Sequence, residues 1–413
     1  MDAFMKWMAD NGAILDAVQV VDSEARGYGL AVADERGSVR AGDLLLSVPA
    51  RLMLLPHNTV ARAPYLSVLT SAKQPLTGAE ALCLFLCRER LLGSKSAWAP
   101  YLNTLPQTFS TPIFLESFEK RCCKENLLPL EGRRLLESQR REVAVGYAKC
   151  RTLAAQLLGG APDAEGLLCP SLYLWAWNVV NTRSVFVEHG RPMLSFLDRS
   201  GGSDGDKLAL IPFFDLINHA AESQHESRFD RANACYELRA GTAATGGAEL
   251  FVCYGPHSNT RLLLEYGFLL PANANNRVEI SADELLDYAR RVGMHPTPEH
   301  GRVLAVSRLT FALYAVQSTL AWSAMAAVHL LTMGRQQLSR WDEVYRVAED
   351  EWVSATISNA AAIIRLVESD CRERRDECRA DAVLGQAASQ LWDEYVTIVS
   401  NSLAQLQSEY ALT

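Results

Sequence analysis

Two apolar runs of the chain each end in side chains that could hold and orient a ligand. The first run, residues 208–214, contains no charged residue and is followed by Asp215, Asn218 and His219. The second run lies farther along the chain and ends at Tyr254. Short apolar runs bounded by turn residues are typical of buried strands. The sequence therefore predicts a site at which the ends of two separate strands converge.

Each of these residues also has a purely structural interpretation. Tyr254 could be a core tyrosine with a satisfied hydroxyl group, and His219 could be a buried, hydrogen-bonded histidine. Asn218 could cap a turn. Asp215 could be a structural hydrogen-bond acceptor rather than a base. The residue types alone leave these alternatives open.

A hairpin is expected near the N-terminus, where two glycines stand between apolar residues. Gly27 and Gly29 flank Tyr28, in a segment that follows the apolar run 18–21. Glycine permits tight turns and lets the backbone come close to a ligand. A dinucleotide-binding fingerprint would need a further glycine where Val32 stands, followed by a helix, so that class of site is excluded.

Helices are expected in the middle and in the C-terminal part of the chain. Apolar residues recur with the helical period from about residue 77 to 182, and Thr77 with Glu80 resembles a capping box at the start of this block. The span 309–334 contains no charged residue. Polar residues in the middle of this span predict two buried helices rather than one transmembrane helix. Beyond residue 280 the chain is expected to be helical.

The composition is that of a globular protein with more than one domain. The 413 residues are 49% hydrophobic and 21% charged, which suits a sizeable core in two or three domains. The formal net charge of −8 argues against broad nucleic-acid binding, which needs a basic face. It agrees better with a basic partner such as a lysine-rich protein segment. Neither direct nucleic-acid binding nor membrane insertion is expected.

Cysteine usage and the N-terminus bear on the cellular compartment. The ten cysteines are scattered without a C-x-x-C pair, so reduced thiols and no metal site are expected. Acidic residues at Asp2 and Asp10 bracket too short an apolar span for a signal peptide. These features predict a cytoplasmic or nuclear protein.

Three motifs together resemble SET-domain protein methyltransferases. They are Leu-Ile-Pro-Phe-Phe-Asp-Leu-Ile-Asn-His at 210–219, Glu-Leu-Phe-Val-Cys-Tyr-Gly at 249–255 and Glu-Tyr-Gly-Phe at 265–268. The arrangement is most similar to the class with a helical insert in the SET domain and a Rubisco-methyltransferase-type substrate-binding domain behind it. The segment 98–101 resembles part of that insert, and the likeness covers residues 20 to 400.

The resemblance implies an α+β fold, with a β-rich SET domain that carries a helical insert and an all-α domain behind it. The implied parts are the N-terminal part of the SET domain at 1–76, the helical insert at 77–183, the SET core with the donor site at 184–275 and the substrate-binding domain at 276–413. The resemblance also implies a knot-like crossing, where the chain after Tyr254 passes the segment with Asn218 and His219.

The resemblance further implies S-adenosylmethionine as the methyl donor. Tyr254 matches the catalytic tyrosine, Arg183 matches a position that contacts the donor carboxylate, and Phe268 matches the one that packs on adenine. Without the resemblance, Arg183 could be half of a surface ion pair and Phe268 a core residue. The implied donor-binding residues are Gly27, Tyr28, Gly29, Arg183, Asp215, Asn218, His219, Tyr254 and Phe268. A channel for the side chain that receives the methyl group could be lined by Val185, Phe186 and Phe214.

Three functions are compatible with this resemblance. The first is a monomeric protein-lysine N-methyltransferase that acts on an exposed lysine of a histone or another protein. The second is a protein-histidine N-methyltransferase, because some relatives methylate a histidine of actin. Those relatives carry a polar residue and a tryptophan where this chain has Val185 and Phe214, and an apolar lining suits a lysine stem better. The third is a non-catalytic SET-like binding module, which predicts loss of the tyrosine or of the donor contacts, whereas Tyr254, Asn218 and His219 are present.

Overall fold

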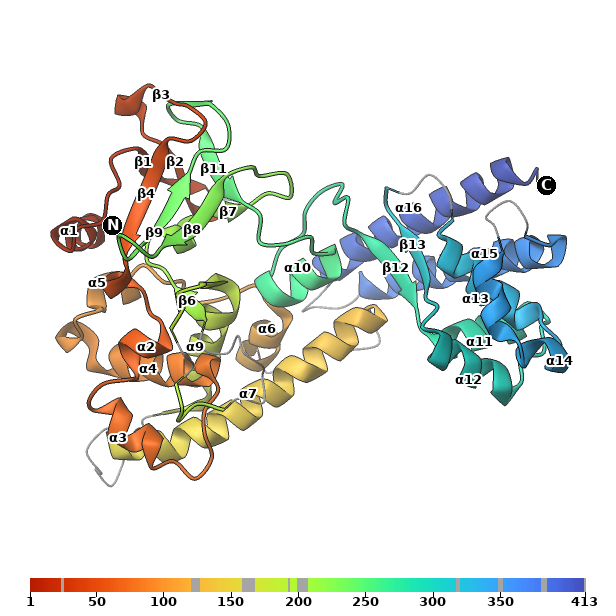
Figure 1. Ribbon diagram of the computed structural model, residues 1–413, viewed down its shortest axis with the longest axis horizontal. Coiled ribbons are helices and arrows are strands. Elements are labelled where there is room, and N and C mark those ends of the chain that lie inside the picture. The colour runs from red at the N-terminus through yellow and green to blue at the C-terminus, as the bar shows by residue number, and fades with distance from the viewer. Residues whose placement is uncertain are drawn as a thin grey trace. The chain divides into compact units, whose positions relative to one another are not determined.

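The chain divides into two compact units in the computed structural model (Figure 1). The first unit comprises Met1–Ser110 and Ser138–Pro256, and the second comprises Thr111–Glu137 and His257–Thr413. These units divide the chain differently from the expected domains, because the second takes in part of the expected insert. The structure describes residues 1–23, 26–119, 127–157, 168–191, 194–198, 207–316, 320–347, 352–379 and 385–411.

The first unit is built around two small β-sheets. One sheet has the strand order β1-β2-β11-β7 and the other has the order β4-β9-β8, while β3 pairs with β10 and β5 with β6. The strands are β1 (Val18–Ser23), β2 (Gly27–Val32), β3 (Ser38–Val39), β4 (Leu44–Pro49), β5 (Ser184–Phe186), β6 (Leu208–Leu210), β7 (Asn218–His219), β8 (Glu226–Asp230), β9 (Cys235–Arg239), β10 (Ala244–Thr245) and β11 (Glu249–Val252).

The hairpin expected near the N-terminus is confirmed. Strands β1 and β2 pair antiparallel, with Val20 opposite Leu30 and Ser23 opposite Gly27. Leu30 is fully buried, as are the two residues that follow it on β2. The buried half of β2 therefore anchors the strand, while its glycine-containing half lies at the more exposed end.

The first unit also contains a helical block. The capping box expected at residue 77 is present, since Glu80 N donates to Thr77 Oγ1 at 3.1 Å and Thr77 N donates to Glu80 Oε2 at 2.8 Å. Helix α4, which this box begins, packs against α9, whose last residue is Arg183. The helices are α1 (Asp2–Asp10), α2 (Pro56–Thr59), α3 (Tyr65–Thr70), α4 (Gly78–Leu92), α5 (Ala99–Leu102), α9 (Pro170–Arg183), most of α7 (Leu130–Leu157), and the 3-10 helices η1 (Asp34–Arg36), η2 (Ala50–Leu52), η3 (Gly93–Lys95) and η5 (Phe214–Leu216).

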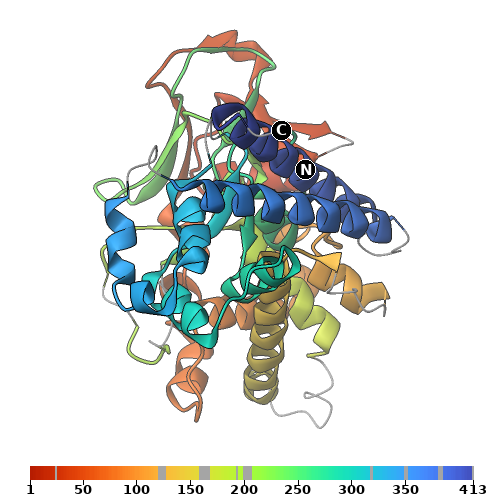
Figure 2. The ribbon, with the colours of Figure 1, turned by 90° about the vertical axis from the view of Figure 1, so that its right-hand side faces the viewer.

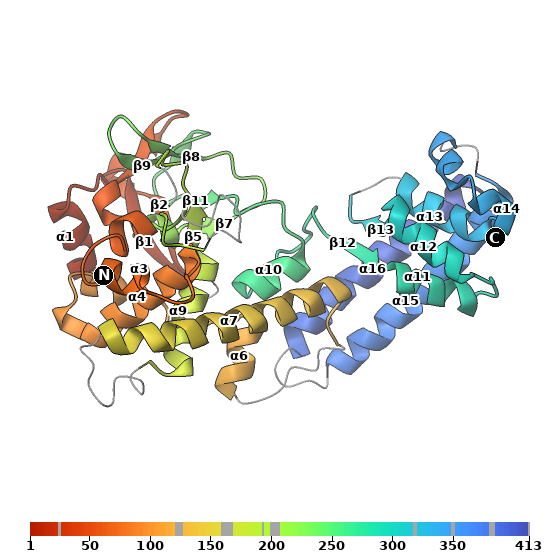
Figure 3. The same cartoon turned by 60° about the horizontal axis from the view of Figure 1, so that its bottom comes forward.

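The second unit is mainly helical. Its two long helices pack side by side, as Figures 2 and 3 show for α15 and α16 in blue. None of the helices within the described ranges combines the length and the apolar character that a bilayer crossing requires. The helices are α6 (Pro112–Glu119), α10 (Asn259–Tyr266), α11 (Ala282–Arg291), α12 (Pro298–Ser307), α13 (Trp322–Thr332), α14 (Arg335–Leu338), α15 (Ser354–Cys378), α16 (Gly385–Glu409) and the 3-10 helix η6 (Trp341–Arg346).

The uncharged span 309–334 differs from the expected pair of helices. Its first part forms the strand β13 (Phe311–Tyr314), which pairs antiparallel with β12 (Arg277–Ile280), and its second part contains α13. A short apolar run fits a strand as well as a buried helix. The expected break near Ser318 lies outside the described residues.

The α+β fold class is confirmed, with a β-rich part and a mainly helical C-terminal part. The C-terminal part is not purely helical, because β12 and β13 form a two-stranded sheet within it.

Candidate active site

Strand β11 lies between β2 and β7 and brings Asn218 and His219 beside the segment that precedes Tyr254 (Figure 1). It pairs antiparallel with β2 and parallel with β7, where Val252 lies opposite His219. Because the second pairing is parallel, Asn218 and His219 run alongside the residues that lead to Tyr254. Asn218, His219 and Tyr254 therefore converge, as the sequence predicts. The first predicted strand is wrong in part, because residues 208–214 form only the short strand β6 and the start of η5, and Asn218 and His219 form the strand β7 themselves.

The side chain of Tyr254 is held against β7 through its hydroxyl group and its ring. The hydroxyl group donates a hydrogen bond to the carbonyl oxygen of Ile217 at 2.7 Å. The ring stacks on the imidazole of His219, with 4.9 Å between centroids and 24° between planes. A phenol fixed in this way has a defined direction, which suits a residue that orients a reacting group.

The contacts of His219 assign its tautomer. Nδ1 lies 3.1 Å from Tyr254 N and 3.2 Å from the carbonyl oxygen of Val252. A backbone N–H can only donate, so Nδ1 is the acceptor and the neutral ring carries its proton on Nε2. The Val252 carbonyl accepts instead from Ala220 N at 3.1 Å. His219 thus positions the backbone and the ring of Tyr254.

Gly29 on β2 leaves room for the side chain of Asn218. A Cβ atom at Gly29 would lie 2.9 Å from Asn218 Nδ2 and 3.0 Å from Glu249 Oε1. Asn218 Nδ2 donates to Glu249 Oε1 at 2.9 Å, and Arg26 Nη1 donates to Glu249 Oε2 at 3.0 Å. The Glu249 carboxylate therefore links the glycine-containing loop to the segment on β7.

Arg183, Tyr101 and Asp215 form a second cluster in the same unit. Arg183 Nη1 donates to the carbonyl oxygen of Asp215 at 2.8 Å and lies 3.5 Å from Asp215 Oδ2. The Tyr101 hydroxyl group donates to the same Oδ2 at 2.8 Å. Tyr101 is fully buried, and the side chain of Asp215 is 2% exposed. One buried carboxyl group thus joins the end of α9 to α5.

In this second cluster, some polar atoms of Asp215 and Arg183 remain available to bind a ligand. Burial raises the pKa of the Asp215 carboxyl group, whereas the charge of Arg183 and the hydrogen bond from Tyr101 lower it. Asp215 Oδ1 is buried and has no hydrogen-bond partner in the part of the chain that the structure describes. Within that part, Arg183 donates through Nη1. Its Nε and Nη2 atoms therefore stay available for a ligand carboxylate.

The backbone that leads into η5 is strained. Phe213 is fully buried and has a φ of 77°, a region that residues with a side chain rarely occupy. Its ring lies 6.2 Å from that of Phe4, so the strained residue is held by core packing. Strained residues cluster at functional sites, and here the next element carries Asp215.

The other implied donor-binding residues have less specific surroundings. Tyr28 is 44% exposed on β2, and Gly27 has a φ of 71° that suits its place in the turn. Phe268 belongs to the second unit, where its ring centroid lies 6.1 Å from that of Tyr266. Its packing on adenine stays a prediction.

The implied channel residues do not share one environment. Phe214 is buried and packs edge-to-face on Tyr236, with 4.9 Å between ring centroids. Val185 is half-buried, whereas Phe186 is 65% exposed. Phe214 has the surroundings of a core residue, and a channel lined by all three side chains stays a prediction.

Glu249, Arg26 and Tyr101 were not among the site residues predicted from the sequence. Glu249 meets Asn218 because β11 pairs with β7, and Tyr101 meets Asp215 through tertiary packing. Such contacts follow from topology, and no local spacing rule predicts them. A charged residue at the start of the apolar strand β11 is the signal that could have pointed to Glu249.

A group of potential metal ligands lies on the hairpin of β8 and β9. The ligand atoms of Asp230, Cys235 and Glu237 lie within 4.8 Å of one another. Glu237 already pairs with Arg239 at 2.9 Å, and Asp230 accepts from the backbone of its own turn. Both carboxylates therefore have structural roles as they stand.

The chain shows clear similarity to known proteins, although no protein-family model matches it. It is 31% identical over 316 residues to SET domain-containing protein 4 of Mus musculus, which covers 75% of this chain and 68% of the relative. It is also 31% identical over 314 residues to the protein of that name in Homo sapiens, which covers 74% of this chain and 67% of the relative. The chain belongs to the SET-domain family.

Further relatives and solved structures agree with the assignment of this chain to the SET-domain family. Actin-histidine N-methyltransferase of Drosophila melanogaster is 27% identical over 290 residues, which covers 68% of this chain and 51% of the relative. The structure of Rubisco LSMT bound to AdoMet superimposes with a TM-score of 0.60 at 19% identity, covering 99% of this chain and 92% of that chain. The SET domain of LSMT bound to lysine and AdoHcy superimposes with a TM-score of 0.59 at 19% identity, covering 99% of this chain and 91% of that chain. These structures confirm the expected SET fold of the LSMT type.

Proposed function

We propose that this SET-domain protein is an S-adenosylmethionine-dependent protein-lysine N-methyltransferase. The observation that carries the proposal is the convergence of Asn218, His219 and Tyr254 where β7 runs beside β11. The relatives named actin-histidine N-methyltransferase and the LSMT structure bound to AdoMet support methyl transfer to a protein.

The residues of the first unit suit the amino-acid end of this donor, which carries a carboxylate and an ammonium group. Arg183 has guanidinium donors left for a carboxylate, and such charged pairs are strong. Gly29 has no side chain and so lets the amide of Asn218 and the carboxylate of Glu249 come close to the backbone of β2. When bound, the donor supplies a methyl group on a positively charged sulfur.

The role of the chain is to receive and orient a neutral amine. A lysine of ordinary pKa costs about 4.6 kcal/mol to deprotonate at pH 7. Apolar surroundings and a nearby positive charge disfavour the ammonium form and lower this cost. The Tyr254 phenol, fixed by Ile217 and His219, is placed to orient the lone pair of the amine.

A histidine acceptor is the second candidate, favoured by the relatives named actin-histidine N-methyltransferase. Val185 and Phe214, if they line the acceptor channel as the resemblance implies, argue for lysine instead. An aliphatic stem gains from apolar contact, whereas a buried imidazole needs a hydrogen-bond partner. A channel that has no polar side chain to bind an imidazole therefore favours lysine as the acceptor.

Transfer of a labelled methyl group tests the proposal. The protein is incubated with isotope-labelled S-adenosylmethionine and cell extract, and the labelled peptides are analysed by mass spectrometry. Wild type should label lysine side chains, and Tyr254→Phe should lose about 100-fold in rate, as expected when one oriented hydrogen-bonding group is removed at reacting atoms. Label on histidine would favour the second candidate, and no label on any protein would contradict both.

Tyr147→Phe is the matched control. The Tyr147 hydroxyl group also donates to a backbone carbonyl, that of Leu168 at 3.2 Å, but it lies on α7. Its loss should leave methyl transfer unchanged. An equal loss in both variants would mean that Tyr254 acts through stability alone.

A further inference from the structure

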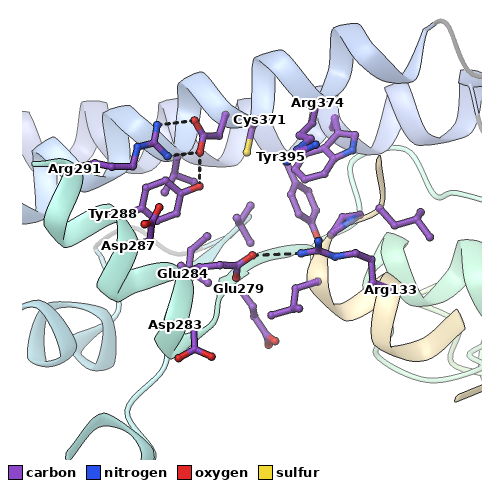
Figure 4. A pocket seen from close by; sticks show the side chains of 18 residues that line it. Arg133, Glu279, Asp283, Glu284, Asp287, Tyr288, Arg291, Cys371, Arg374 and Tyr395 are labelled. Carbon is purple, nitrogen blue, oxygen red and sulfur yellow. Dashed lines mark hydrogen bonds and ion pairs between the residues drawn. The ribbon is translucent and has the colours of Figure 1, made fainter. Parts of the chain in front are cut away.

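The second unit contains a cavity that shares no residue with the candidate active site. Its volume is about 430 Å³, within the range of small-ligand pockets. The lining comes from α11, β12, α15 and α16 and from the segment around the start of α7 (Figure 4). All of these lining residues belong to the second unit, so the cavity is formed within one compact body.

The floor of the cavity is apolar and aromatic. Trp392 and Tyr395 pack edge-to-face, with 5.3 Å between ring centroids, and both line the cavity. The Trp392 indole donates to the carbonyl oxygen of Leu127 at 2.6 Å, which fixes the ring. Val278 and Val367 add buried aliphatic surface. Such a floor favours an aliphatic stem, and its aromatic faces can attract a cation.

Most charged groups of the wall already have partners. Arg291 binds Asp370 through two hydrogen bonds of 2.7 and 3.0 Å, and the Tyr288 hydroxyl group donates to the same carboxylate at 2.9 Å (Figure 4). Arg133 pairs with Glu284 at 3.4 Å. The cations of these pairs are neutralised in place, so they do not make the cavity a site for anions.

Two carboxylates of the wall remain without such a partner. Asp283 and Asp287 lie one turn apart on α11, and both are exposed. Neither makes a hydrogen bond or an ion pair within the described ranges of the chain. Arg374 of the facing helix α15 pairs with Glu377 at 3.2 Å. Among the described residues that line the cavity, the charge without an ion-pair partner is therefore negative.

We infer that this cavity binds an arginine or lysine side chain of a peptide segment that belongs to the protein substrate. The aromatic and aliphatic floor takes the stem, and Asp283 and Asp287 take the charged head. An acidic or purely apolar segment would leave both carboxylates unpaired or desolvated, which costs free energy. The inference rests on the proposed function for the identity of the segment, but the binding itself needs no donor.

Peptide binding without donor tests the inference. The probe is a fluorescein-labelled Gly-Arg-Gly-Arg-Gly amide, and the same peptide with glutamine in place of arginine is the uncharged comparison. Fluorescence anisotropy should show tighter binding of the arginine peptide to the full chain. Asp283→Asn combined with Asp287→Asn should weaken its binding about fivefold, as expected for two exposed charge contacts.

Asp16→Asn combined with Asp342→Asn is the matched control. Both residues are exposed, make no hydrogen bond or ion pair within the described residues, and do not line the cavity. This control should bind the arginine peptide like wild type, which would support the inference. Equal binding of the two peptides, or equal weakening by the two double variants, would overturn it.

Donor affinity separates this inference from the proposed function. The Asp283→Asn, Asp287→Asn variant should bind S-adenosylmethionine like wild type in calorimetry. Failure of methyl transfer with intact binding of the arginine peptide would contradict the proposed function and leave the cavity as a site for basic side chains.

Discussion

At the scale of single residues, the candidate active site depends on two contact clusters with little free space. Gly29, Asn218 and Glu249 are in mutual contact on neighbouring strands. Asp215 is shared by Arg183 and Tyr101. In both clusters, a small change at one residue should displace neighbouring groups that we assign to donor binding.

Gly29→Ala should weaken donor binding. The new Cβ atom would lie 2.9 Å from Asn218 Nδ2, so the amide must move and its bond to Glu249 must lengthen. Because the crowded atoms are ends of side chains, the fold should be kept, and donor affinity measured by calorimetry should fall about fivefold, as expected when one hydrogen bond is displaced. Gly334→Ala is the control, because its Cβ atom would meet Gln337 at an ordinary 3.6 Å. Unchanged affinity in Gly29→Ala would contradict the assignment of β2 to the donor site.

Tyr101→Phe should act on donor binding through Arg183. The substitution removes the 2.8 Å hydrogen bond to Asp215 Oδ2, which then pairs with Arg183 alone. Loss of a hydrogen bond to a buried charged group costs about 1.5 kcal/mol, so the KM for the donor should rise about tenfold. The kcat should change less, because Tyr101 touches neither the donor nor the amine in this account.

Tyr236→Phe is the comparison for this variant. The Tyr236 hydroxyl group donates to Ser227 Oγ at 3.1 Å, within the sheet β4-β9-β8. Steady-state kinetics should show no change of the donor KM in this control. A fall of kcat without a change of KM in Tyr101→Phe would rule out the positioning role.

The sequence predicted that Asn218, His219 and Tyr254 converge, but it did not predict what holds them. Tyr254 follows β11 as expected, whereas Asn218 and His219 form β7 themselves instead of ending a strand over 208–214. The partners Glu249 and Tyr101 lie far from Asn218 and Asp215 in the chain. Only the parallel pairing of β7 with β11 and the packing of α5 bring them there.

At the scale of elements, a buried polar cluster ties α10 to α16 within the second unit. Asn259 is fully buried and donates through Nδ2 to Glu394 Oε2 at 2.7 Å. Asn276 Nδ2 donates to the same oxygen at 2.6 Å, and Asn276 Oδ1 accepts from Asn259 N at 2.6 Å. One carboxylate oxygen of α16 therefore holds the start of α10 and the loop before β12.

Glu394→Gln should change the pH dependence of stability. Burial raises the pKa of Glu394 in the folded state, while the hydrogen bonds from Asn259 and Asn276 lower it. A folded-state pKa above the unfolded one means that the wild type loses stability as pH rises through the folded pKa. Glutamine keeps an oxygen acceptor for both amides and does not titrate.

Denaturant unfolding at acidic and neutral pH measures this effect. The gain in the free energy of unfolding of Glu394→Gln over wild type should be larger at neutral pH than at acidic pH. Glu373→Gln, an exposed change on α15, serves as the control and should show no such trend. A gain that shrinks toward neutral pH would contradict the direction assigned to Glu394.

The elements were predicted best where local signals were strong. The capping box at Thr77 and the glycine-containing hairpin were both correct. The prediction of two helices over 309–334 was wrong for the first part of the span, because a short apolar run fits a buried helix and a strand equally well. Its pairing with β12 decided the outcome, and that pairing is a long-range contact.

At the scale of the whole molecule, the two contact clusters of the candidate active site belong to the first compact unit, and the proposed cavity for a basic side chain belongs to the second. The net charge of −8 agrees with a basic protein partner. Family and fold could be predicted from short motifs in the right order, whereas the boundaries of the units could not. One of those boundaries, between Glu137 and Ser138, falls within a continuous helix, α7, where no linker composition marks it.

The central claim is that β2, β7 and β11 build a donor site in which Tyr254 serves the chemistry rather than the binding. Calorimetric titration of wild type and Tyr254→Phe with S-adenosylmethionine tests it most directly. The account predicts that both proteins bind the donor with similar affinity, because Tyr254 is assigned to the amine. A folded wild type that does not bind the donor, or a Tyr254→Phe variant that loses binding altogether, would contradict it.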